Sequence, residues 1–94
     1  MRIAWTLPAL DDIRDIDDWL TKEATPTTAL RTLAAIKYRA RFLKDFPHGG
    51  RPLGGGNRVL RVYDTPYLIR YRIRHDVVEV IRVHHEREDW QLQS

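Results

Sequence analysis

The chain has 94 residues, no cysteine and a formal net charge of +3 at pH 7. This length suits one compact domain, residues 1–94, built around one core of modest size. The absence of cysteine excludes a disulfide framework and a thiolate metal site, and it fits a reducing compartment. Because no signal peptide and no apolar run of about 18 residues can be recognised, we expect a cytoplasmic protein without a membrane segment.

The positive charge changes its character along the chain. Residues 1–47 hold eight lysines and arginines, whereas all eight basic side chains in residues 48–94 are arginines, joined there by the four histidines. Arginine presents a planar fork of N–H donors that matches carboxylates and phosphates. The second half therefore predicts an acidic partner, which can be nucleic acid, an acidic peptide or both.

Residues 2–6 predict a short first strand, and a helix follows it. Pro8 stands where the first turn of a helix tolerates proline. Apolar residues then recur at helical spacing, whereas aspartates fall on the opposite, solvated side. The apolar positions are Leu10, Ile13, Ile16 and Leu20, and the acidic ones are Asp11, Asp15 and Asp18.

A second helix is predicted between Thr25 and Phe46. Thr25 is suited to the N-cap, and Pro26 follows at the first helical position. The apolar stripe of this helix consists of Leu30, Leu33, Ile36, Ala40 and Leu43. Because a short link joins two amphipathic helices, we expect an antiparallel helical hairpin.

A segment rich in glycine and proline, residues 47–57, follows the helices. It holds five glycines and two prolines in eleven residues, which predicts irregular structure. Beyond it, alternating residues predict three strands within residues 58–64, 67–74 and 77–83, joined by short turns as an antiparallel meander. The last strand is more uniformly apolar than the other two, which indicates a central position with both faces buried.

Together these elements predict an α+β fold of order β-α-α-β-β-β, with an antiparallel sheet packed against the helical hairpin. In the second strand of the meander, tyrosine and isoleucine alternate with arginine, so Arg70 and Arg72 face away from the helices, with Arg61 from the strand before. Like charges on neighbouring strands repel unless an anion lies among them. Two interpretations follow: neutralisation by Glu79 and Asp64, or a surface that binds an acidic partner.

Short motifs in a fixed order along the whole chain resemble the RelE/ParE toxins. They are Trp5-Thr6-x-Pro8-x-Leu10, Gly50-Arg51-Pro52, Tyr67-Leu-Ile-Arg-Tyr-Arg-Ile73 and Val80-Ile-Arg82-Val-His-His85-Glu-Arg87-Glu-Asp89-Trp90. The resemblance implies the toxin of a type II toxin–antitoxin pair, neutralised by a DNA-binding antitoxin with an acidic tail. Operator DNA is then contacted only through the antitoxin. Candidate receptors for the tail are the outer groove of the helical hairpin and a free sheet edge.

The two branches of this family differ in their target. ParE-like members inhibit DNA gyrase by binding, and RelE-like members cleave mRNA on the ribosome. The ParE-like branch is favoured because no lysine follows Lys44, Leu68 stands where many ribonuclease members carry arginine, and the C-terminal segment offers a tryptophan instead of a tyrosine. The residues expected to bind the target or the antitoxin are Arg61, Arg70, Arg72, Arg82, His85, Arg87 and Trp90.

A ribosome-dependent mRNA endoribonuclease is the alternative, with Arg61, Arg82, His85 and Arg87 as its catalytic set. His84 and His85 cannot act as a pair because neighbouring residues of a strand face opposite sides. A non-toxic nucleic-acid-binding α+β module is a further alternative, which the lack of aromatic residues among the outward arginines disfavours. The histidines show no metal-ligand spacing, and no cofactor is expected.

Overall fold

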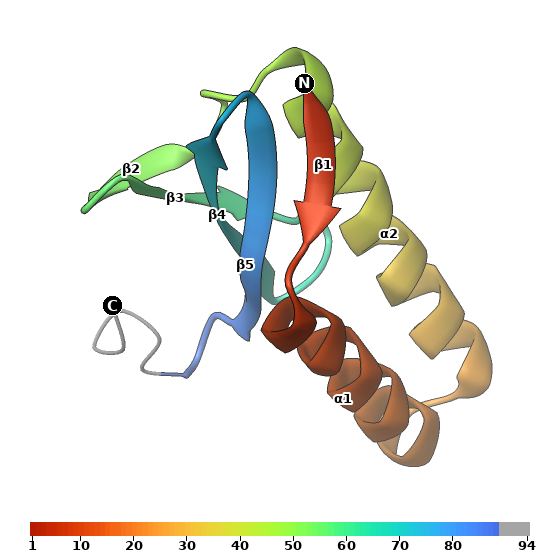
Figure 1. Ribbon diagram of the computed structural model, residues 1–94. Coiled ribbons are helices and arrows are strands. Elements are labelled where there is room, and N and C mark those ends of the chain that lie inside the picture. The colour runs from red at the N-terminus through yellow and green to blue at the C-terminus, as the bar shows by residue number, and fades with distance from the viewer. Residues whose placement is uncertain (89–94) are drawn as a thin grey trace.

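The computed structural model describes residues 1–88 and shows a five-stranded sheet with two helices on one side (Figure 1). The strands lie in the order β1-β5-β4-β3-β2, so β5 is an interior strand, as its apolar sequence predicts. The α+β fold, the helical hairpin and the meander are confirmed. In chain order the elements are β1 (Arg2–Trp5), α1 (Leu7–Glu23), α2 (Pro26–Asp45), β2 (Arg51–Gly54), β3 (Asn57–Arg61), β4 (Tyr67–Arg74) and β5 (Val77–His85).

The sheet differs from the prediction in two respects. It is mixed rather than antiparallel, because β1 pairs with β5 in parallel. The prediction of irregular structure over residues 47–57 is wrong for Arg51–Gly54, which form β2 and pair antiparallel with β3. Gly54, Gly55 and Gly56 all have positive φ and make the turn of this hairpin. The glycines that suggested irregularity are thus the residues that a tight connection between two strands requires.

Both helices begin at the threonine–proline signals. The Thr6 hydroxyl accepts a hydrogen bond from the N–H of Ala9, and the Thr25 hydroxyl accepts one from the N–H of Thr28. These caps satisfy N–H groups that the first helical turn leaves without a partner. The sequence therefore fixes where the hairpin starts and where it reverses direction.

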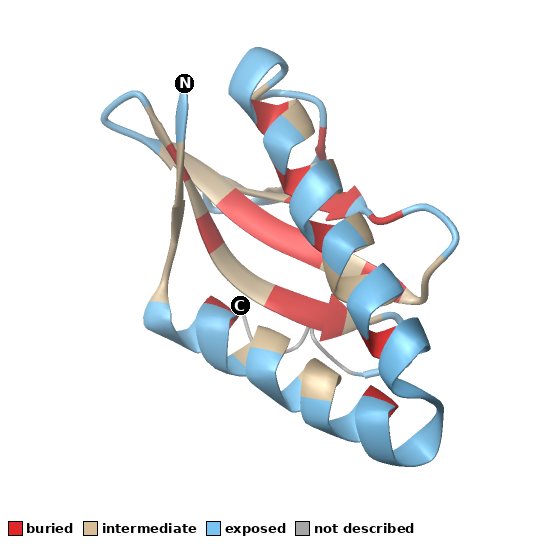
Figure 2. Cartoon of the chain, turned by 90° about the vertical axis from the view of Figure 1, so that its right-hand side faces the viewer, coloured by how far each residue is buried: buried red, intermediate tan, exposed pale blue. Residues whose placement is uncertain are grey.

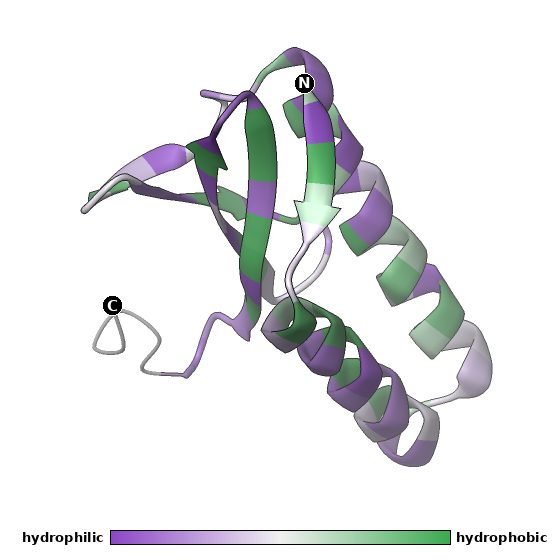
Figure 3. Cartoon of the chain, in the orientation of Figure 1, coloured by the Kyte–Doolittle hydropathy of each residue, from purple (hydrophilic) through white to green (hydrophobic). Residues whose placement is uncertain are grey.

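The hydrophobic core lies between the helices and the sheet face that they cover (Figure 2). Most of β5 is hydrophobic (Figure 3), and Val78, Val80 and Val83 of this strand belong to the core. Leu10 and Leu30, which the apolar stripes include, are instead 43% and 71% exposed, so the buried stripes are narrower than predicted. The largest fully buried apolar side chains are Ile36, Leu43, Val62, Ile69, Tyr71, Val78 and Val80.

Tyr71 fastens the segment before β2 to this core. Its hydroxyl donates to the carbonyl oxygen of Pro47 at 2.8 Å and accepts from the N–H of Gly50 at 2.8 Å. A Cβ atom on Gly50 would lie 2.6 Å from that hydroxyl, so a larger residue has no room. Burial raises the pKa of Tyr71, which keeps the hydroxyl protonated as a donor. The position of β2 at the sheet edge thus depends on one buried tyrosine.

Candidate functional site

A β-bulge decides which residues of β5 face away from the helices. Arg70 of β4 lies opposite Arg82, whereas the next residue, Tyr71, lies opposite Val80, so Ile81 is an additional residue on β5. In a regular strand Arg82 would share the face of Val80, which is the core face. The bulge instead places Arg82 on the face away from the helices, opposite Arg70, and Val83 on the core face, opposite Ile69.

As a result Arg82 joins Arg61, Arg70 and Arg72 on the sheet face opposite the helices, which is termed the polar face. Arg70 and Arg82 lie directly across from each other, and Arg72 lies across from Glu79. Arg61 of β3 lies across from Leu68 of β4, which is on the same side. The predicted grouping of Arg61, Arg70 and Arg72 is therefore confirmed, and the bulge adds Arg82 to it.

Most of these arginines are engaged within the chain. Arg72 Nε lies 2.7 Å from a carboxylate oxygen of Glu79, and Arg61 Nη2 lies 3.2 Å from one of Glu86. Of the two acids predicted to neutralise the row, Glu79 does so, whereas Asp64 is in no ion pair among residues 1–88. The row of outward guanidinium groups is consequently a set of ion pairs more than a free cationic surface.

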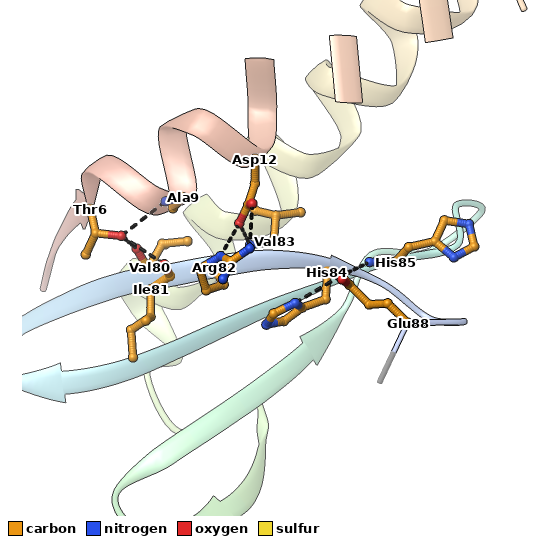
Figure 4. Close-up of polar contacts among 10 residues, drawn as sticks. All are labelled: Thr6, Ala9, Asp12, Val80, Ile81, Arg82, Val83, His84, His85 and Glu88. Atoms are coloured by element: carbon orange, nitrogen blue, oxygen red, sulfur yellow. Dashed lines mark hydrogen bonds and ion pairs between the residues drawn. The ribbon is translucent and has the colours of Figure 1, made fainter. Parts of the chain in front are cut away.

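Asp12 of α1 makes the most elaborate of these contacts (Figure 4). Its carboxylate accepts two hydrogen bonds from Arg82, at 2.8 and 2.9 Å, and a third from the backbone N–H of Val83 at 2.8 Å. The bond to Asp12 raises the pKa of Arg82, so this arginine stays charged. Asp12 therefore ties α1 to both the side chain and the free backbone edge of β5.

Thr6 closes the same edge one step earlier. Its hydroxyl lies 3.0 and 2.9 Å from the carbonyl oxygens of Val80 and Ile81, the residues at the bulge (Figure 4). β1 pairs with β5 only as far as Val80. Where the parallel pairing with β1 ends and the bulge begins, the side chains of Thr6 and Asp12 therefore bind the backbone groups of β5 that β1 no longer reaches.

Sequence reasoning missed Asp12, although a signal for it exists. Asp12 follows the buried Ala9 by three residues and precedes the half-buried Ile16 by four, so it falls inside the apolar stripe of α1. The exposed aspartates Asp11 and Asp15 lie beside the stripe, as predicted. An acid inside an inward stripe indicates a buried cationic partner, here 70 residues away.

His84 is fully buried on the polar face, and its Nδ1 lies 3.0 Å from a carboxylate oxygen of Glu88. That carboxylate also accepts the backbone N–H of His85 at 2.8 Å. Burial lowers the pKa of His84, and the charge of Glu88 opposes this only in part. The imidazole is therefore held neutral around pH 7 and acts as a fixed part of the surface.

Arg70 differs from the other arginines of the polar face. It is only 8% exposed, its Nε atom is buried without a hydrogen bond, and it is in no ion pair among residues 1–88. Burial lowers the pKa of its guanidinium group, and the neighbouring charge of Arg82 lowers it further. A buried cation without a contacting anion is unusual in a folded protein.

The residues proposed for ribonuclease chemistry are not all brought together on one face, although the N–H of Arg87 donates to His85 Nδ1 at 3.1 Å. Arg82 lies on the polar face, whereas His85 lies on the core side, where its ring meets Tyr67 edge-on at 5.5 Å. His84 and His85 face opposite sides, as predicted. Arg87 is exposed in the turn after β5, and Trp90 lies outside the described residues.

A groove runs beside α2, away from the arginine row. Its volume is about 590 Å³, and Arg39 crosses it between the rings of Phe42 and Tyr63, at 4.7 and 4.3 Å. Arg39 also donates to the carbonyl oxygen of Arg61 at 2.8 Å, which fixes the stack. Exposed tyrosine and arginine in a hollow are typical of protein-binding surfaces.

Two other kinds of site are not found in residues 1–88. No three histidine or acidic side chains there are grouped so that they could hold a metal ion. Neither of the two helices combines the length and the apolar character needed to cross a membrane. The features that the described residues do offer are the polar face, the groove beside α2 and the exposed sheet edge at β2.

Comparisons with known proteins agree on one family. The family described as "ParE toxin of type II toxin-antitoxin system, parDE" matches residues 3–90. Protein Y4kP of Sinorhizobium fredii is 38% identical over 90 residues, which cover 95% of this chain and 92% of that protein. Toxin RelE2 of Caulobacter vibrioides is 32% identical over 84 residues, 89% of this chain and 93% of that protein.

A solved structure shares the fold. The structure titled "Chromosomal ParDE TA system from P. aeruginosa" superposes with a TM-score of 0.85 and 24% identity, over 90% of this chain and 95% of that chain. Fold similarity at this identity does not by itself establish activity. The family match extends over nearly all of the elements described above, from β1 to the end of β5. This chain therefore belongs to the ParE toxin family of type II toxin–antitoxin systems.

Proposed function

We propose that this chain acts in the cytoplasm as an inhibitor of DNA gyrase and that a cognate antitoxin neutralises it. The observation that carries the proposal is the state of the residues that a nuclease would use. Arg61 and Arg82 are held by carboxylates, and His85 packs against Tyr67 on the other side of the sheet. An inhibitor that acts by binding needs a complementary surface and no assembled catalytic set.

The exposed Arg87 is the best candidate for a direct contact with the target. It lies exposed in the turn after β5, and among residues 1–88 its only hydrogen bond is that of its backbone N–H with His85 Nδ1. An exposed arginine next to a rigid strand end can enter a partner's surface without breaking an internal pair. Arg82 cannot be tested as cleanly, because its removal would also leave Asp12 without its cation.

A supercoiling assay with purified gyrase tests this function. The chain should block supercoiling at a low molar excess, and addition of the antitoxin should restore it. Arg87→Ala should weaken inhibition about tenfold or more, as expected for loss of an interface anchor. Lys22→Ala, exposed in the last turn of α1, is the matched control and should inhibit as the wild type does. Full supercoiling at a concentration that arrests growth would rule out gyrase as the target.

Cleavage of ribosome-bound mRNA is the second candidate, because the relative from Caulobacter vibrioides is named Toxin RelE2. An assay with translating ribosomes and a defined mRNA separates the two activities. A ribonuclease should lose cleavage on His85→Gln, because glutamine cannot transfer a proton as the histidine of the predicted catalytic set would. Retention of growth arrest by His85→Gln would support an inhibitor that acts by binding.

A further inference from the structure

Arg70 stands out because it is the only buried arginine within residues 1–88, and it lacks a contacting acid there. Its neighbour Asp12 influences it only through space, because the oxygens of Asp12 are already taken up by Arg82 and the N–H of Val83. A cation that is nine-tenths buried and unpaired destabilises the free chain. Such a group is explained when a partner supplies the missing anion.

The surroundings of Arg70 restrict the kind of anion. On the polar face Arg61, Arg72 and Arg82 are each matched by one carboxylate, so these pairs add little net charge. A nucleic-acid backbone binds through several unpaired cations that neutralise successive phosphates. Arg74 on the same face is also in no ion pair among residues 1–88, but it is exposed, whereas Arg70 is buried and cannot lie along a run of phosphates. The position of Arg70 suits one isolated anionic group.

The depth of Arg70 restricts the anion further. Only 8% of the residue is exposed, so an anion reaches it at the end of a side chain that inserts between its neighbours. A carboxylate fits the planar fork of a guanidinium group through two parallel hydrogen bonds. Arg82, directly across on β5, is already paired with Asp12, so the unmatched charge at this position is that of Arg70.

We propose that Arg70 is the receptor for one aspartate or glutamate side chain of the antitoxin, inserted beside the Asp12–Arg82 pair on the polar face. The proposal rests on the proposed function in one respect, namely that an antitoxin exists. A partner that remains bound compensates the buried charge for as long as the complex lasts, whereas a transient target does not. The antitoxin then covers the polar face in addition to any contact in the groove beside α2.

Binding of the purified antitoxin, measured by calorimetry, tests the proposal. Arg70→Gln should weaken binding about 30-fold or more, because the antitoxin carboxylate would be buried without its cation. Arg70→Lys keeps the charge but not the fork and should fall between Arg70→Gln and the wild type. Arg74→Gln is the matched control, since Arg74 is exposed on the same strand and the same face. Binding of Arg70→Gln within threefold of the wild type would overturn the proposal.

Folding of the variant is checked separately. Arg70→Gln removes an uncompensated buried charge, so its urea midpoint should equal or exceed that of the wild type. If the variant does not fold, the side-chain Nε–Hε NMR signals of the wild-type chain give the answer. The signal of Arg70 should shift and become protected from exchange on addition of the antitoxin. An Arg70 signal that is unchanged in the complex would overturn the proposal.

Two further measurements separate this inference from neighbouring ones. A short DNA duplex should show no Arg70-dependent binding at about physiological ionic strength. Such binding would show that the anion bound by Arg70 is a phosphate and would overturn the proposal of a carboxylate. Loss of antitoxin affinity in Arg70→Gln without any effect of the chain on gyrase would leave the receptor intact and reject only the target. Gyrase inhibition by the chain, together with unchanged antitoxin affinity in Arg70→Gln, would support gyrase as the target and reject Arg70 as the receptor.

Discussion

The two faces of the sheet are buried by different means. On β4 the neighbours Ile69 and Arg70 are both largely inaccessible, 0% and 8% exposed, yet one lies in an apolar core and the other among charges. Burial of apolar area stabilises wherever it occurs. Burial of charge stabilises only where each group has a partner. The stability contributed by the helix-covered face therefore depends on how much apolar area is buried. The stability contributed by the polar face depends on whether each charged side chain has a partner.

The largest effect is expected on the core face. Ile69→Ala should destabilise the chain by about 3 kcal/mol, through lost apolar burial and the cavity left behind. Leu68→Ala, next in the strand but half-buried on the polar face, should cost about 1 kcal/mol. Urea unfolding of both variants makes the measurement. Equal losses would mean that the two faces contribute to stability in the same way.

Removal of the acid on α1 should come second. Asp12→Asn would leave Arg82 without its counter-ion and weaken the contact to the N–H of Val83, at a cost of about 2 kcal/mol. The neighbouring Asp11→Asn is the control, since the Asp11 pair with Arg14 is exposed and contributes little. Hydrogen exchange at the amide of Val83 should accelerate in Asp12→Asn alone. A variant as stable as the control would show that the edge of β5 needs no acid.

A smaller effect is expected from pH. The pKa of His84 in the folded chain lies below the ordinary value of 6.5, because burial disfavours the imidazolium form. Above pH 6.5 the group is neutral in both states, so it leaves stability unchanged. As the pH falls below 6.5, only the unfolded chain gains the proton, and stability is lost.

Unfolding at about pH 7.5 and about pH 5.5, on either side of the ordinary histidine pKa, measures this loss. His84→Gln should remove that part of the pH dependence. The nearby charges are those of Glu88, Arg70 and Arg82. An identical pH dependence in the variant would show that another group is responsible.

The smallest effect should come from an exposed ion pair of the polar face. The side chains of Arg72 and Glu79 are 43% and 26% exposed, so solvent screens their attraction. Arg72→Gln should change the free energy of unfolding by about 0.5 kcal/mol or less. Measurement at low and high salt would sharpen the comparison with Asp12→Asn, since salt screens the exposed pair more strongly.

The helices and the meander could be predicted because their signals are local. Thr25 with Pro26 marks a helix start, and alternation along residues 67–74 marks a strand with two distinct faces. The parallel pairing of β1 with β5 could not be predicted in this way, because it depends on residues more than 70 positions apart. β2 was not predicted because the glycines next to it suggested irregular structure. These glycines form the turn between β2 and β3, and composition alone does not show that two strands pair across them.

The candidate site was predicted in part. Alternation correctly placed Arg70 and Arg72 on one face, but the partners of the arginines depend on tertiary contacts, such as the one between Asp12 and Arg82. The face of Arg82 could not be derived from alternation, because Ile81 interrupts it and the apolar pair Val80-Ile81 gives no sign of which residue is the additional one.

The additional residue at position 81 gives the length of β5 a meaning of its own. A regular ladder that kept Ile81 would place Arg82 opposite Ile69, toward the core, and Val83 on the outer surface. A chain that lacked Ile81 would place Arg82 opposite Arg70 without any bulge, but it would lose the carbonyl oxygen that the Thr6 hydroxyl contacts. A relative whose strand is shorter by one position here could therefore present the same outer arginines on a straight strand, with a different connection to the start of α1.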